Sequence, residues 1–112
     1  MNEPKIGTEA VLEEIHHERK RQVVVEGMSR LHDDAYTRNE LALAAMSYCQ
    51  SGSVAAFDTT PLKVRPPIFW PWSKDWWKPK DKRRDLIRAA ALVVAEIERL
   101  DRKIACLSGY HP

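Results

Sequence analysis

The stretch that decides the fold is the C-terminal run from Lys82 to about Leu107, KRRDLIRAAALVVAEIERLDRKIACL. Its large apolar residues recur every three or four positions, which places them on one face of an α-helix. Asp81 precedes the run as a helix N-cap, and Ser108-Gly109 ends it. We therefore expect the longest helix at about 82–107, packed on the core through this apolar face. The face comprises Leu86, Ala90, Val93, Val94, Ile97, Leu100 and Ile104, and opposite it lie Arg84, Arg88, Glu98, Arg99, Arg102 and Lys103.

A first helix is expected at about 8–27, with Thr8 as its N-cap and Gly27 as its stop signal. Two polar residues, Arg19 and Gln22, interrupt its apolar line, at positions where Leu would be expected. This line consists of Val11, Leu12, Ile15, Val23 and Val24.

A second helix is expected at about 38–50, after a polar connector at 29–37. Its alanines favour close packing, so we expect it to be central. Its expected buried face contains Leu41, Ala42, Ala45, Tyr48 and Cys49.

The segment at about 54–80 holds five of the seven prolines and all four tryptophans. Proline at this density excludes a long helix or a central strand. The indoles of Trp70, Trp72, Trp76 and Trp77 are too apolar to be left in water, so we expect an ordered loop pressed on the helices. The predicted fold is thus all-α: one domain over residues 1–112, with three helices and a long Trp/Pro-rich loop between the second and third.

Length and composition limit the functions that this chain could have. A chain of 112 residues has room for one domain. Its net charge of +2 is too small to indicate a partner of strong negative charge, such as nucleic acid or an anionic membrane. No apolar run is long enough for a membrane span, and the first residues do not resemble a secretory signal. Two cysteines, Cys49 and Cys106, are typical of reduced thiols, so we expect a cytoplasmic protein. Four glycines provide no phosphate-cradling loop, and no complete catalytic motif is present.

The tryptophans are followed by a basic run, for which three interpretations remain open. The basic side chains face solvent at the start of the helix, or they hold the phosphate of a small ligand. The third interpretation is contact with polymeric nucleic acid, which the near-neutral net charge of the chain disfavours. In the connector, His32-Asp33-Asp34 either closes a turn and caps the second helix or faces a ligand. The basic run consists of Lys78, Lys80, Lys82, Arg83 and Arg84.

Acidic side chains offer an alternative, enzymatic interpretation. All-α nucleoside triphosphate pyrophosphohydrolases hold Mg²⁺ through E-E-x-x-E and E-x-x-D motifs on neighbouring helices. Here the second pattern is present at 98–101, but His17 stands where the first requires glutamate. Under this alternative the magnesium ligands are Glu14, Glu18, Glu98 and Asp101; otherwise we expect no metal and no cofactor.

Several longer motifs carry a resemblance: HDD at 32–34, WPW at 70–72, WWKP at 76–79, RRDL at 83–86 and AEIERLDR at 95–102. Over about residues 10–103 they resemble those of a group of short phage and prophage proteins without an assigned activity. This resemblance implies a viral or mobile-element origin. A weaker one, carried by Arg19, Gly27-Met28, Asp33-Asp34, Lys78-Pro79 and Arg84-Asp85-Leu86, is to the ryanodine-receptor repeat domain and implies a binding role.

We therefore expect a non-catalytic binding module that sequesters a nucleotide-like ligand and acts against a host defence pathway. Two alternatives stay open: the magnesium-dependent hydrolase, and an inhibitor that binds a host protein through its tryptophans. The long last helix is also compatible with a homo-oligomer. The expected ligand-binding residues are Arg19, Gln22, His32, Asp33, Asp34, Trp70, Trp72, Trp76, Trp77, Lys78 and Arg84.

Overall fold

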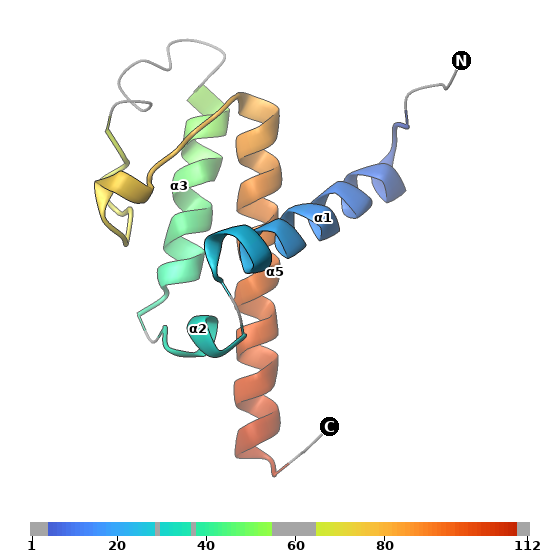
Figure 1. The fold of residues 1–112 in the computed structure, drawn as a ribbon, viewed down its shortest axis with the longest axis vertical. Helices are drawn as coiled ribbons and strands as arrows, with labels where there is room; N and C mark the ends of the chain where they lie inside the picture. The colour runs from blue at the N-terminus through green and yellow to red at the C-terminus, as the bar shows by residue number, and fades with distance from the viewer. Residues whose placement is uncertain (1–4, 29, 37, 55–64, 110–112) are drawn as a thin grey trace.

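The computed structural model describes residues 5–28, 30–36, 38–54 and 65–109, and within these ranges the regular structure is entirely helical. The elements in chain order are α1 (Thr8–Glu26), α2 (Arg30–Asp34), α3 (Glu40–Val54), the single 3-10 turn η1 (Lys74–Trp76) and α5 (Lys82–Leu107). Helices α3 and α5 lie side by side and run in opposite directions, and α1 crosses α5 at a steep angle (Figure 1).

The core lies between α3 and α5. Small residues line the contact, with Ala44 and Ala45 on one side and Ala89 and Ala95 on the other, all of them buried. Alanine lets two helices approach closely, as the sequence of α3 indicates. Larger side chains complete the core. They are Met28, Leu41, Tyr48, Trp77 and Leu92.

The expected connector at 29–37 contains a further helix, α2, so the described residues form four α-helices rather than three. Beyond it, the backbone N–H groups of Ala35 and Tyr36 bond to the carbonyls of His32 and Asp33, which closes the turn. This short helix is stable because Asp33, which is fully buried, accepts a hydrogen bond from Arg19 of α1. The sequence does not reveal this tertiary contact.

Helix boundaries follow local signals. Asp81 caps α5 by accepting a hydrogen bond from the Arg84 N–H at 2.9 Å, and Gly27 ends α1 in the left-handed region with φ of 73°. The cap of α1 differs from expectation, because Gly7 occupies the N-cap position and makes no side-chain bond, while Thr8 is already helical. Helix α3 continues to Val54, past the expected end at Gln50.

The most important correction concerns the faces of α5. Its predicted core face is exposed: Leu86 is 42%, Ile97 53% and Ile104 63% accessible. The buried face instead carries Asp85, Arg88 and several small residues. Asp85 accepts bonds from Ser51 and the Lys80 N–H, which offset its burial. Arg88 donates one bond, from Nη1 to the Lys78 carbonyl, and its Nε has no partner.

Helix α1 shows the same inversion. Its expected apolar line is largely exposed at Leu12 and Val24, whereas Glu18, Arg19 and Gln22 are buried. The packing of α1 on α5 is therefore made by ion pairs rather than by an apolar stripe.

The described part of the Trp/Pro segment, residues 65–80, lies beside α3 and carries η1 (Figure 1). Its tryptophans differ in environment: Trp77 is buried, Trp70 and Trp72 are half-buried, and Trp76 is 60% exposed. The segment's first part, 55–64, lies outside the described residues.

Candidate functional site

A cavity of about 610 Å³ opens between the end of α1, α2, α3, the segment 70–80 and α5. Its size falls within the range of small-molecule sites. Five aromatic side chains line it: Tyr36, Tyr48, Trp70, Trp72 and Trp76. The remaining lining residues are Glu18, Arg21, Gln22, Val25, Glu26, Met28, His32, Ser73, Lys78, Lys80, Arg88 and Leu92.

The aromatic wall is fixed by contacts among its own rings. Trp70 is the hub, with ring centroids 5.6 Å from Tyr48, 5.2 Å from Trp72 and 4.9 Å from Trp77, each close to edge-to-face. Its indole N–H donates to the Ser73 carbonyl at 3.0 Å. Trp77 stacks on Tyr48 from the core side at 4.8 Å. The wall is therefore preorganised, and ligand binding would not have to order these rings.

Positive charge borders the aromatic wall. The guanidinium of Arg88 lies 5.5 Å from the ring centre of Tyr48, and the Lys78 ammonium lies 5.9 Å from that of Trp76. The lining contains four basic side chains (Arg21, Lys78, Lys80 and Arg88) and two acidic ones. The cavity thus combines apolar ring faces with an excess of cations.

Three lining side chains carry buried polar atoms that have no hydrogen-bond partner: Gln22 Oε1, Arg88 Nε and Trp72 Nε1. Gln22 and Arg88 are more than nine-tenths buried, and Trp72 is half-buried. An unpaired buried donor or acceptor costs about 1–3 kcal/mol, so burial without a partner is unusual. One acceptor and two donors are therefore unpaired in the side chains that line the cavity.

One lip of the cavity is an ion cluster around Glu18. Its carboxylate, almost completely buried, accepts two bonds from Arg21 at 2.7 and 2.9 Å and one from Arg84 at 2.9 Å. Burial opposes ionisation, but these hydrogen bonds and charges outweigh it, so the pKa of Glu18 lies below its usual value. Glu18 is therefore held as an anion by its own chain.

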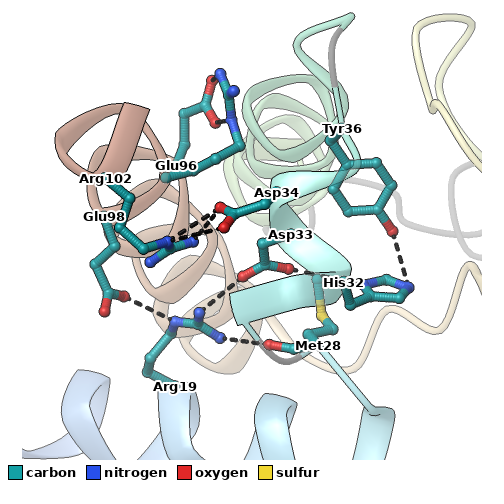
Figure 2. Close-up of polar contacts among 10 residues, drawn as sticks. Arg19, Met28, His32, Asp33, Asp34, Tyr36, Glu96, Glu98 and Arg102 are labelled. Atoms are coloured by element: carbon teal, nitrogen blue, oxygen red, sulfur yellow. Dashed lines mark hydrogen bonds and ion pairs between the residues drawn. The ribbon is translucent and has the colours of Figure 1, made fainter. Parts of the chain in front are cut away.

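A second cluster joins α1, α2 and α5 (Figure 2). Arg19 donates to Asp33 at 2.8 Å, to Glu98 at 3.0 Å and to the Met28 carbonyl at 3.3 Å. Burial raises the pKa of Asp33 despite the opposing charges of Arg19 and His32. These bonds use the Arg19 guanidinium to connect three elements of the fold.

The neighbouring Asp34 is exposed and accepts two bonds to one oxygen from Arg102, at 3.0 and 2.7 Å (Figure 2). On the cavity side of α2, the Tyr36 hydroxyl lies 3.4 Å from His32 Nε2. Burial raises the pKa of Tyr36 to about 12, so the phenol stays protonated.

The structure brings together part of the expected site. Gln22, His32, Trp70, Trp72, Trp76 and Lys78 line one cavity. The other five expected residues do not line it. Arg19 and Asp33 are paired with each other, Asp34 pairs with Arg102, Arg84 pairs with Glu18, and Trp77 belongs to the core. The four charged residues among them stabilise the fold, because each neutralises an opposite charge that packing brings close.

The magnesium alternative is not assembled. Glu14 is held by two bonds from Arg83 at 2.6 and 2.8 Å, Glu18 by Arg21 and Arg84, and Glu98 by Arg19. Asp101 is exposed on α5. Within the described ranges, no three acidic, histidine or cysteine side chains are grouped to hold a metal ion.

Sequence reasoning missed several lining residues, above all Tyr48 and Arg88. The sequence predicts Tyr48 in the core and Arg88 on the solvent face of α5. Its spacing does not distinguish Arg88 from Arg84, which lies one helical turn earlier and does not line the cavity.

Comparison of the chain with protein-family models, with curated proteins and with solved structures finds no match. Among the helices in the described ranges, none has the length and apolar character that a bilayer span requires.

Proposed function

We propose that the protein is a binding module that holds a planar, phosphate-bearing, nucleotide-like ligand in the aromatic cavity. The observation that carries this proposal is the combination, in one cavity, of five aromatic side chains with an excess of basic ones. The proposed ligand follows from this combination, because a nucleobase offers a flat π-face and its phosphate offers negative charge.

Aromatic stacking supplies the first part of the recognition. A base stacked on an aromatic side chain is worth about 1–3 kcal/mol, with little dependence on base identity. The half-buried rings of Trp70 and Trp72 provide such a surface beside Tyr36.

Electrostatics supplies the second part. Lys78 and Lys80 are exposed at the end of the aromatic segment and line the same cavity. An ammonium group binds phosphate as a point charge and leaves the phosphate's orientation open. Because Glu18 and Glu26 are already held by Arg21, the two lysines are the cations that a phosphate would engage.

The protein would sequester the ligand and would not convert it chemically. Sequestration requires affinity and stoichiometry and no catalytic group, in keeping with the acidic side chains being paired with arginines. The proposal includes the phage origin that the resemblance to phage proteins implies, together with the expected cytoplasmic location and a role against a host defence pathway. It also treats the Trp/Pro segment as an ordered loop that completes the site.

The test is a thermal-shift and calorimetry screen against mono-, di- and cyclic nucleotides and NAD-derived ligands, each with and without Mg²⁺. A ligand at 100 times its Kd adds about 2.7 kcal/mol, which moves the Tm of a domain of this size by several degrees. We expect a shift without Mg²⁺ and without ligand breakdown. A shift that requires Mg²⁺ and yields a product would contradict the proposal.

A pair of lysine variants makes the test specific. Lys78→Met removes a cation that lines the cavity, whereas Lys74→Met removes one from the same segment that does not. We expect Lys78→Met to weaken binding of a phosphate-bearing ligand about tenfold and Lys74→Met to leave the Kd unchanged. Equal effects of the two would place the ligand elsewhere.

A second candidate function, binding of a host protein, is favoured by Trp76. Its ring is 60% exposed and carries the Lys78 ammonium over its face. Tryptophan dominates interface hot spots. If the nucleotide screen shows no shift, affinity capture with wild-type protein and with Trp76→Ala tests this candidate, because a partner that uses the hot spot is lost only with the variant.

A further inference from the structure

The exposed side of α5 carries a regular pattern that the proposed function does not use. Its apolar residues alternate at spacings of four and three, which is the a/d pattern of a coiled-coil seam. Ala90, Ile97 and Ile104 occupy a positions. The d positions hold Leu86, Val93, Leu100 and Leu107.

Six of these seven side chains are exposed in the single chain, and Ala90 is half-buried. Leu86 and Leu100 are 42% accessible, Val93 is 44%, Ile97 is 53%, and Leu107 is 80%. The buried residues of α5, from Asp85 to Ala95, lie on the other side of the helix. Beyond them, the C-terminal part of α5 extends past α2 and α3 (Figure 1). Because this apolar seam is exposed on a helix that projects from the core, we expect another protein surface to bury it.

The exposed apolar surface continues onto α1. Val94 connects the seam to a groove of about 920 Å³ between α1 and α5, which is also lined by Leu12, Ile15, Val23 and Val24. Leu12 and Val24 are 58% and 81% exposed. Contiguous apolar patches of this extent on single chains mark interaction sites.

We propose that a second copy of this chain covers the α5 seam, with the two α5 helices packed antiparallel. A twofold axis between residues 98 and 99 sets Ile97 against Leu100 of the second copy and Val93 against Ile104. It also sets Ala90, the smallest residue of the seam, against Leu107, so that a small side chain faces a large one. In this antiparallel arrangement, the projecting C-terminal end of each α5 lies along the N-terminal part of the other α5, which is the part that packs on the core.

The charges beside the seam favour this direction. In a parallel pair, Glu96 at a g position would face Asp101 at the e position of the other helix, which sets two carboxylates together on each side. In the antiparallel pair, Glu96 faces Lys103 instead, once on each side of the axis. Glu96 already accepts bonds from Arg99 at 2.6 and 3.1 Å, and a carboxylate has room for a further donor.

The available area is that of a specific interface. The exposed parts of the seven seam side chains, Val94 and the flanking stems are on the order of the ~800 Å² that each partner buries in a standard complex. A twofold contact uses the same seam of both chains, so one seam pairs with one other seam and the assembly closes as a dimer. The partner is therefore one second copy.

The oligomeric state tests the proposal by light scattering and sedimentation of the full chain. We expect twice the mass of one chain. Ile97→Glu, which places a charge in the centre of the seam, should raise the dimer Kd by about 100-fold or more. The matched control is Met46→Glu, since Met46 of α3 is 52% exposed and lies outside the seam, and it should leave the dimer intact.

Circular dichroism should show unchanged helix content in both variants, so that loss of the dimer is not loss of the fold. A wild-type chain that stays monomeric at about 100 μM, a concentration well above the Kd of a standard interface, would overturn the proposal. An assembly that survives Ile97→Glu would overturn it as well.

Disulfide trapping tests the direction of packing. Both native cysteines are exposed, so the background carries Cys49→Ser and Cys106→Ser. Ala90→Cys and Leu107→Cys proteins, mixed and oxidised, should form the mixed cross-linked dimer, because a disulfide requires Cα atoms within about 7 Å. Leu107→Cys oxidised alone should not cross-link; if it does, the helices are parallel and the antiparallel assignment is wrong.

Discussion

Replacement of Arg19 by methionine tests the claim that this arginine belongs to the fold and not to the ligand site. In the wild type its guanidinium faces Asp33, whose side chain has no solvent exposure, at 2.8 Å. The variant leaves that carboxylate buried without a cation. Removing one partner of a buried ion pair costs about 3–5 kcal/mol. The bond to Glu98 adds little, because that side chain is 46% exposed and screened by water.

We expect the Tm of Arg19→Met to fall by about 12–20 °C, taking roughly 4 °C per kcal/mol for a domain of this size. The control is Arg102→Met. Arg102 binds the adjacent Asp34 at 2.7 Å, but Asp34 is 42% exposed, so this variant should lose less than about 1 kcal/mol. Urea denaturation followed by circular dichroism measures both. Equal losses in the two variants would refute the assignment of the large cost to burial of Asp33.

The cost of Arg19→Met also depends on pH. Burial already raises the pKa of Asp33 in the wild type, and loss of Arg19 raises this pKa further. In the range between the unfolded pKa, near 3.9, and the folded pKa, the folded state binds the proton more tightly. Stability therefore falls as the pH rises through that range. We expect the loss to be larger at pH 7 than at pH 5, and the opposite trend would contradict the mechanism.

Three further predictions concern other parts of the fold. Trp77→Ala should cost about 3–5 kcal/mol in urea denaturation and Trp76→Ala less than about 0.5, because only the first ring is buried in the core; similar costs would show that the two environments are misassigned. Asp81→Ala should cost about 1 kcal/mol by removing the N-cap of α5, and an unchanged urea midpoint would exclude that role. Hydrogen bonds from Arg83 hold the pKa of Glu14 below its usual value, so Arg83→Met should raise that pKa toward normal in an NMR titration, whereas an unchanged pKa would assign the shift to another cause.

The candidate site was partly visible in the sequence. The clustering of tryptophans with Lys78 indicated an aromatic, basic surface, and six of the expected residues line the cavity. The sequence predicts Arg19 and Asp33 in the ligand site, because polar residues within an apolar pattern are typical both of ligand sites and of buried ion pairs. Sequence spacing does not distinguish the two, since the difference depends on which opposite charge, such as Asp33 for Arg19, is brought near by the packing.

The sequence by itself determined the helical class and the boundaries of the longest helix. Both follow from local physics: a sustained period of three to four residues, a capping aspartate at position 81 and stop signals at Gly27 and Gly109. The tertiary structure alone decided which face of each helix is buried. In α5 the alanine-bearing face packs on α3 because it permits close approach, and the more hydrophobic face through Ile97 stays outside. Periodicity shows that a helix has an apolar face, but what covers that face depends on the other elements and, as we propose, on a second chain.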